Sequence, residues 1–284
     1  MNGETLGSFL RTRRDKTNPD LIGLDPAGAP RRVPGLRREE LARFAGVSVG
    51  YYTRIEQDQA GTASAQVLDA LASVMRLDDV ERAHLYNLSR SRSPSRMVRD
   101  APERLHHRVS SLFESLREAV PVVALGRRGD VLAWNHSGHE LLFGHLPFEA
   151  PADAHRRPSV PRLFFLDPDT RGLYGNWEEL ARTHVAYLRL TSGRYSHDAG
   201  LAELIGELAA GSGDFAGLWA EGDVADCTVG RMLLSHPTMG PLDVDYQVWS
   251  QPESPDHRLE VYTPNDAATR SALALLPGTG APPS

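Results

Sequence analysis

The chain has 284 residues, a formal net charge of −6 and one cysteine, Cys227, which excludes an internal disulfide. It has no secretory signal, and no apolar run reaches the roughly 20 residues that a membrane-spanning helix needs, so we expect a cytoplasmic protein of two domains. Residues 1–54 carry ten basic and six acidic side chains, whereas residues 100–284 carry fifteen and twenty-five. The N-terminal part is therefore the part suited to a polyanionic partner.

The N-terminal segment predicts one amphipathic helix followed by an irregular loop. Leu6, Phe9 and Leu10 recur at helical spacing, and the pattern stops before Pro19. Residues 17–36 are too rich in proline and glycine for a helix and exceed the usual length of a helix connection. We therefore expect an inserted loop there.

Residues 34–57, PGLRREELARFAGVSVGYYTRIEQ, predict two short helices joined by a tight turn. Glu39 and Glu40 stand in the first turn of the first helix, where negative charge suits the positive end of the dipole. Gly46 ends that helix, because glycine adopts the left-handed conformation without a Cβ clash. Ser48 caps the second helix by accepting from backbone amides at its start. So short a turn makes the helices cross steeply, as in a helix-turn-helix.

The second helix of the pair should leave one face exposed after its apolar residues turn inward. That face is shaped to enter a major groove, and Arg54 supplies its strong hydrogen-bonding fork, suited to guanine. For the bare spacing, the alternative is an ordinary helical hairpin with a glycine turn. The residues expected to meet DNA on this helix are Ser48, Val49, Gly50, Tyr51, Thr53 and Arg54.

The longer string LRREELARFAGVSVGYYTRIEQ resembles the Xre-type helix-turn-helix, in the form found in MmyB-like transcription regulators of actinobacteria. The resemblance implies sequence-specific binding to a double-stranded DNA operator and, by analogy, a homodimer on paired half-sites. It also implies an ion pair between Arg14 and Glu56, for which the alternative is two solvated charges. A GC-rich source agrees with the composition, since Lys16 is the only lysine among 31 basic residues.

Cations beside the motif should position the protein on phosphates without reading sequence. These residues are Arg31, Arg32, Arg37 and Arg38, joined by Tyr51. For Arg31 and Arg32 the alternative is a solvated loop. Where the family carries a small glycine after Gln57, this chain has Asp58, which should weaken phosphate contact at that helix end.

Two further helices complete the N-terminal domain. One begins at Thr62 or Ser64 and carries Leu68 and Leu71, and the next opens at Asp78. We predict a five-helix Xre-like DNA-binding domain over 1–90, a basic linker over 91–103 and a second domain over 104–284.

The sequence of the second domain predicts an α+β fold, with an antiparallel sheet flanked by helices. Two strands are expected in the string VVALGRRGDVLAWN, about a turn at 126–130. Amphipathic helices are expected over 177–190 and 201–219, and three strand candidates follow near the end of the chain. The strings ALGRRGDVLAWN, LFFLDPDTRGLYGNWEELA and HPTMGPLDVDYQ resemble the ligand-binding domain of MmyB-like regulators, which implies a PAS-like fold. Residues 228–235 carry a single basic residue where the family is more basic, which weakens the case for an anionic ligand at that strand.

The second domain also carries more large apolar side chains than a thin layer between sheet and helices obviously needs. An elongated apolar pocket for a fatty acid or similar apolar ligand would use them, since affinity follows apolar area removed from water. The alternative is that they form only the core, and that the domain serves only for dimerisation. The pocket candidates are Leu141, Leu142, Phe143, Leu163, Phe164, Phe165, Leu180, Tyr187 and Trp219.

Other chemistry finds little support in the sequence. His136 and His139 have the spacing of two metal ligands on one helical turn, but no third ligand follows at suitable spacing. Cys227 has no paired cysteine or obvious neighbouring base, so we expect a buried or partly buried thiol rather than a redox switch or nucleophile. No nucleotide-binding loop, nucleophile elbow or zinc-protease string occurs, so we predict no enzyme, no catalytic residue, no metal and no cofactor.

Overall fold

The computed structural model describes residues 4–22, 35–61, 63–90, 103–105, 109, 111, 116, 120–251 and 254–276. The chain forms two compact units, one within 1–98, 185–202 and 218–226, the other within 99–184, 203–217 and 227–284. In the part of the chain so described, no helix is both long and apolar enough to cross a membrane. The predicted linker lies outside the described residues except for residue 103, so the domain limits at 90 and 103 stay a prediction.

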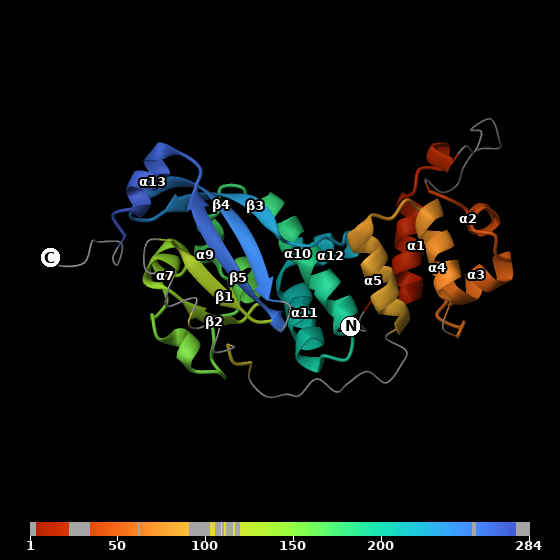
Figure 1. Ribbon diagram of the computed structural model, residues 1–284, viewed down its shortest axis with the longest axis horizontal. Coiled ribbons are helices and arrows are strands. Elements are labelled where there is room, and N and C mark those ends of the chain that lie inside the picture. Colours follow the sequence, from red (N-terminus) through yellow and green to blue (C-terminus); the bar gives the residue numbers. More distant parts are fainter. Residues whose placement is uncertain are drawn as a thin grey trace. The chain divides into compact units, whose positions relative to one another are not determined.

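Five helices build the N-terminal part of the first unit, as the sequence predicts (Figure 1). They are α1 (Leu6–Lys16), α2 (Arg38–Phe44), α3 (Val49–Glu56), α4 (Ala65–Val74) and α5 (Asp79–Arg90), with a 3-10 turn, η1, at Pro19–Ile22. Ser64 rather than Thr62 caps α4, because its hydroxyl accepts from the backbone N–H of Val67 at 3.4 Å. Thr62 lies outside the described residues.

The turn between α2 and α3 has the predicted geometry. Gly46 has φ 67°, the left-handed conformation that favours glycine. Ala42 of α2 and Tyr52 and Ile55 of α3 are buried in the same apolar core. On the other side of α3, a Cβ added to Gly7 of α1 would lie 2.3 Å from the carbonyl oxygen of Glu56. The missing side chain at Gly7 therefore lets α1 approach α3 closely.

The second unit contains one antiparallel sheet of five strands in the order β2-β1-β5-β4-β3 (Figure 1). The strands are β1 (Val122–Leu125), β2 (Val131–Trp134), β3 (Val229–His236), β4 (Gly240–Gln251) and β5 (Ser254–Pro264). β1 lies beside β5, which is more than 120 residues away in the chain, with Val123 opposite Glu260. This sheet confirms the α+β class predicted for the C-terminal part.

The helices of the C-terminal part are α7 (His136–Leu142), α8 (Val160–Leu166), α9 (Pro168–Leu173), α10 (Trp177–Arg194), α11 (Ala199–Gly211), α12 (Gly213–Glu221) and α13 (Ala267–Leu273), with a 3-10 turn, η2, at Ala150–Ala152. The single helix predicted over 201–219 is wrong, because the chain breaks at Ser212. The Ser212 hydroxyl accepts from the N–H of Phe215 at 3.1 Å and so caps a new helix, α12.

The outer edge of β3 is covered by the segment between α9 and α10. Gly175 donates its N–H to the carbonyl of Leu233 at 2.7 Å, and the Asn176 side chain accepts from the N–H of Leu233 at 3.0 Å. The same amide donates to the carbonyl of Arg231 at 3.0 Å. These bonds occupy backbone groups that an edge strand otherwise leaves unpaired.

Candidate DNA interface and ligand pocket

The exposed face of α3 has the composition that the sequence predicts. Ser48 caps the helix, accepting from the N–H of Tyr51 at 3.2 Å. Val49 is 44% exposed, and a Cβ added to Gly50 would meet no atom within 4 Å, so the backbone there is open to close approach. Arg54 is exposed, with its guanidinium 5.9 Å from the centre of the Tyr51 ring. This surface combines one hydrogen-bonding fork with small apolar groups.

Glu56, at the end of α3, holds three arginines from two other parts of the fold. Its Oε1 accepts from Nε of Arg11 and Nη2 of Arg14, each at 3.1 Å, and from Nη2 of Arg38 at 3.0 Å. Its Oε2 accepts from Nε of Arg38 at 3.0 Å. The predicted pair of Arg14 and Glu56 is confirmed, and Arg11 and Arg38 join it. The cluster ties α3 to α1 and α2, which fixes the direction in which the exposed face points.

The Glu56 side chain is fully buried, so its charge depends on these partners. Burial by itself would raise the pKa of Glu56, but hydrogen bonds from Arg38 and Arg14 outweigh it and hold the pKa below its ordinary 4.5. Arg14 is also buried, and its Nη1 donates to the carbonyl of Leu36 at 2.7 Å. A buried carboxylate with this many donors remains ionised at neutral pH.

The predicted phosphate contacts occupy different environments. Arg38 forms the bidentate pair with Glu56 and still keeps its side chain 44% exposed. Arg37 is 39% exposed and lies 3.8 Å from Glu39, while its backbone N–H donates to Glu40. Arg31 and Arg32 lie outside the described residues. The sequence analysis missed that Arg38 is held by Glu56, because that contact crosses from α2 to the far end of α3.

Asp58 adopts the left-handed backbone conformation that favours glycine, with φ 56°. Its Oδ1 accepts from the N–H of Gly7 at 3.0 Å, which satisfies a free amide at the start of α1. The carboxylate therefore joins α1 to the residues that follow α3. Its negative charge lies at the N-terminus of α1, where the helix dipole favours it.

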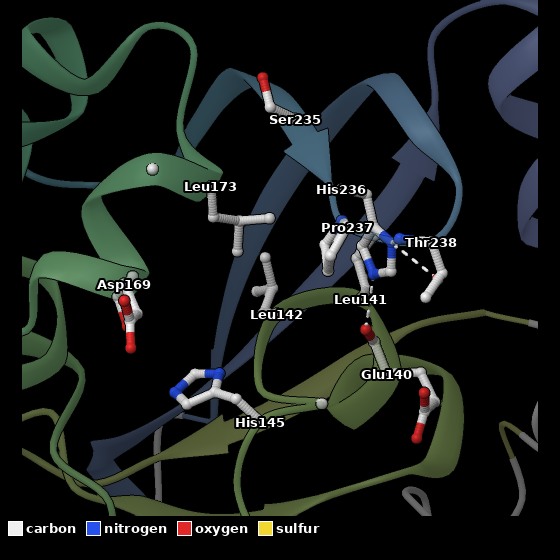
Figure 2. Close-up of a pocket in the computed structure, with 13 residues that line it drawn as sticks. Glu140, Leu141, Leu142, His145, Asp169, Leu173, Ser235, His236, Pro237 and Thr238 are labelled. Carbon is white, nitrogen blue, oxygen red and sulfur yellow. Dashed lines mark hydrogen bonds between the residues drawn. The ribbon is translucent and has the colours of Figure 1, made fainter.

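A cavity of about 340 Å³ lies in the second unit, between α7, α9 and the turn from β3 to β4 (Figure 2). Figure 2 shows Leu142 and Leu173 pointing toward each other, with His145 and Asp169 along one side. The volume is at the lower end of the range for small-molecule sites. The lining residues are Glu140, Leu141, Leu142, Gly144, His145, Asp169, Thr170, Gly172, Leu173, Ser235, His236, Pro237 and Thr238.

His236 fixes one wall of this cavity. Its Nε2 lies 2.9 Å from the carbonyl oxygen of Glu140, while its Nδ1 accepts from the backbone N–H groups of Thr238 and Met239 at 3.3 and 3.2 Å. Since two N–H groups point at Nδ1, the ring proton is on Nε2 and is donated to Glu140. The His-Pro turn is thereby joined to the C-terminal end of α7.

Comparison with protein families assigns both halves of the chain. Residues 105–276 match the MmyB-like transcription regulator ligand binding domain, and residues 5–85 match a helix-turn-helix domain. The chain belongs to the MmyB-like transcription regulators. A search of curated proteins finds no further match. The regulator therefore combines a DNA-binding helix-turn-helix with a ligand-binding domain, and its family is one of transcription regulators rather than enzymes.

The structure does not bring the nine predicted pocket residues of the regulator together at this cavity. Leu141 and Leu142 line it, whereas Phe143 stacks on Trp134 and Phe164 on Trp177 at 5.2 and 5.3 Å between ring centres. The others lie elsewhere: Phe165 and Leu180 are buried, and Leu163, Tyr187 and Trp219 are half-buried. The sequence analysis missed α9, although the Asp167-Pro168 pair is a helix-start signal.

The regulator also buries a charged pair on the sheet. Nε of Arg258 lies 3.3 Å from Oε1 of Glu260, and the Tyr262 hydroxyl donates to Oε2 of Glu260 at 2.7 Å. Burial raises the pKa of Tyr262, and the charge of Glu260 adds to the effect. Burial, followed by the charge of Arg258, lowers the pKa of His184 to about 3. His184 is therefore neutral at physiological pH.

The two histidines considered as metal ligands have other contacts. His136 stacks on Phe148 with ring centres 4.1 Å apart, and Nε2 of His139 lies 2.8 Å from the carbonyl oxygen of Leu146. Within the described ranges, no group of three or more potential ligands could hold a metal ion. Cys227 is buried, as predicted, with its sulfur 3.6 Å from the Tyr246 hydroxyl.

Proposed function

We propose that this regulator binds a DNA operator as a homodimer and changes its operator affinity when a small, fatty-acyl-like molecule occupies the second domain. The observation that carries the DNA half is the exposed face of α3, which Glu56 holds against α1 and α2. We expect the regulator to act in the cytoplasm, where it would bind the DNA of the nucleoid. Two copies would present two α3 helices to half-sites about one helical turn apart.

Arg54 is proposed to read a base, and the other cations to hold phosphates. Arg54 is exposed and lies beside the Tyr51 ring, which limits the directions its guanidinium can take. Arg37 and Arg38 lie at the start of α2, and phosphate contact there supplies affinity without sequence preference. We assign Arg31, Arg32 and Tyr51 to the same role.

The ligand half rests on the cavity beside α7 and α9. Leu142 and Leu173 give it an apolar interior, so an acyl-type chain would gain affinity from the area it removes from water. An effector shifts operator affinity only by its preference for one of two arrangements of the protein, typically about 1 to 3 kcal/mol.

Mass spectrometry of an organic extract from the purified, denatured protein tests the ligand proposal first, in both ion polarities. A stoichiometric acyl-type molecule is the expected result, and adding it to apoprotein should change operator affinity about five- to 150-fold in a gel-shift titration. An unchanged operator affinity at saturating ligand would remove the effector role. A shift with scrambled DNA equal to that with operator would remove sequence-specific control.

A second function, a constitutive DNA-binding protein whose C-terminal domain only dimerises, is favoured by two exposed apolar side chains. Val229 on β3 and Trp249 on β4 are 69% and 61% exposed. Val229 pairs with Gln247, two residues from Trp249, so both side chains lie on one face of the sheet, where an exposed apolar patch would suit a contact surface. Sedimentation of wild type and Trp249→Ser distinguishes the cases, because a dimer through this face should dissociate at least tenfold more readily in the variant.

A further inference from the structure

The first two residues of α3 expose a surface without hydrogen-bonding side chains. Val49 is 44% exposed, and Gly50 beside it has no side chain. The Ser48 hydroxyl, just before them, already accepts from the backbone N–H of Tyr51. Within the described helix α3, no acidic residue lies in the first turn to repel a phosphate backbone. The N-terminal residues of a recognition helix are those that reach base edges, and here they present an apolar side chain and bare backbone.

Nothing inside the regulator accounts for a glycine at position 50. The backbone there is helical, and its φ is not positive, so the conformation does not demand glycine. A Cβ would meet no atom within 4 Å, so packing does not demand it either. Glycine within a helix is less favourable than alanine, because it loses more backbone freedom on folding. A partner that comes close to the α3 backbone would account for the missing side chain.

We infer that Val49 and Gly50 read a thymine in each operator half-site through its C5-methyl group. The methyl group is the apolar feature by which the major-groove edge of a base pair can be recognised. Gly50 would let the α3 backbone come near the base edges, and the Val49 side chain would pack on the methyl group. This inference rests on the proposed function, since it names a base that α3 recognises in addition to the one assigned to Arg54.

Deoxyuridine in place of thymidine tests the inference, because it removes the methyl group and keeps the hydrogen-bonding groups of the base pair. The operator is first selected from random DNA with the full-length protein, and each thymine of one half-site, on either strand, is then replaced in turn. We expect a position at which replacement lowers wild-type affinity about fourfold, as for one methyl group removed from an apolar contact. Full affinity at every replaced position overturns the inference, and so does an operator without thymine.

Val49→Ala tests whether this side chain makes the contact. Val49 is exposed, so the variant should fold as the wild type does. The loss caused by deoxyuridine at the sensitive position should shrink to less than about twofold, because the two changes remove the same contact. Phe44→Ala is the control and should keep the whole loss, since Phe44 is 43% exposed but ends α2, the helix that crosses the DNA backbone. Equal losses in the wild type and both variants overturn the assignment to Val49.

Gly50→Ala tests the close approach of the backbone. The variant should unfold at a higher temperature, because alanine suits a helix better and finds open space there. Its operator affinity should nevertheless fall about tenfold, a loss typical of one mismatched base pair. Gly206→Ala on α11 is the matched control, since a Cβ at Gly206 also meets no atom within 4 Å. That variant should gain stability without losing operator affinity. Unchanged operator affinity in Gly50→Ala overturns the close approach.

The selection from random DNA separates this inference from the proposed function. If no sequence is enriched, sequence-specific control by the regulator is removed, and the inference with it. If an operator is enriched but no methyl group affects its binding through Val49, only the inference is removed, and the DNA half of the proposed function remains.

Discussion

Nη2 of Arg14 lies 3.1 Å from Oε1 of Glu56, although the two residues are 42 positions apart in the chain. Both side chains are buried, and this contact joins the first helix to the end of the helix proposed to read DNA. Removing one partner of such a pair leaves a buried charge without compensation. The free-energy cost of that removal exceeds the net stabilisation that the intact pair provides. The orientation of α3 therefore depends on an ion cluster as well as on apolar packing.

Glu56→Gln should destabilise the helix-turn-helix by about 3 kcal/mol, because three arginines lose their shared carboxylate. Hydrogen exchange of amides in α1 and α3 measures the local free energy of opening. Glu39→Gln is the control, since that carboxylate is 68% exposed and its loss should change little. Similar protection in both variants would show that the cluster does not hold the helices.

Arg54→Ala should reduce affinity for the cognate operator by about 1 to 3 kcal/mol and relax preference at one base pair. Arg38→Ala should instead weaken binding to all DNA sequences alike. It should also reduce the steepness with which the logarithm of affinity falls against the logarithm of salt concentration, by about one. Glu56 keeps Arg11 and Arg14 in that variant, so the fold should persist. Competition binding against operator libraries at two salt concentrations measures both effects, and equal losses on random DNA would refute the division of roles.

Asp58→Ala should cost about 1 to 2 kcal/mol, because alanine tolerates φ 56° poorly and cannot accept from Gly7. Asp58→Asn should cost less, since asparagine accepts the same hydrogen bond and adopts the left-handed conformation more readily. It also removes a negative charge near the DNA-facing unit, so nonspecific DNA affinity should rise slightly. Thermal unfolding and a random-sequence DNA titration test the two statements, and identical melting of both variants would contradict the first.

The stability of the second unit should fall as the pH drops below about 6.5, because burial and Arg258 lower the pKa of His184 to about 3. The unfolded chain binds a proton near pH 6.5 and the folded chain does not, so the free energy of unfolding decreases between these values, by up to about 1.4 kcal/mol per pH unit. In His184→Gln this part of the dependence of the unfolding free energy on pH should vanish. Urea unfolding followed by tryptophan fluorescence at pH 8, 6 and 5 measures it, and parallel curves for wild type and variant would disprove the assignment.

The sequence predicted the parts of the fold that local patterns determine. Gly46 and Ser48 define the turn and the cap of α3 by short-range chemistry, and both are as predicted. Alternating strands and their turns predicted the sheet in the same way. The break at Ser212 was missed, because the helical apolar pattern continues through it and only a side-chain cap starts the new helix.

Site geometry that depends on distant contacts could not be predicted so well. Arg38 was expected to be a phosphate contact, but nothing in its neighbourhood indicated that Glu56 would hold it from 18 residues away. Leu141 and Leu142 line the cavity, but its other walls come from α9 and from the His236 turn, which the apolar pattern of the sequence does not indicate. Large apolar residues identify a core, and the geometry of packing decides which of them line a cavity.

The cover on β3 limits how two copies of the regulator can associate. A sheet continuous across a dimer would need the Arg231 and Leu233 backbone groups, but Gly175 and Asn176 already bond to them. Joining two copies along this edge would first require the α9–α10 connection to detach, exchanging internal hydrogen bonds for equivalent intermolecular ones. Symmetric pairing through a side-chain face avoids that exchange, so recognition between copies is expected to depend on side-chain identity, which can diverge between related regulators in the same cell.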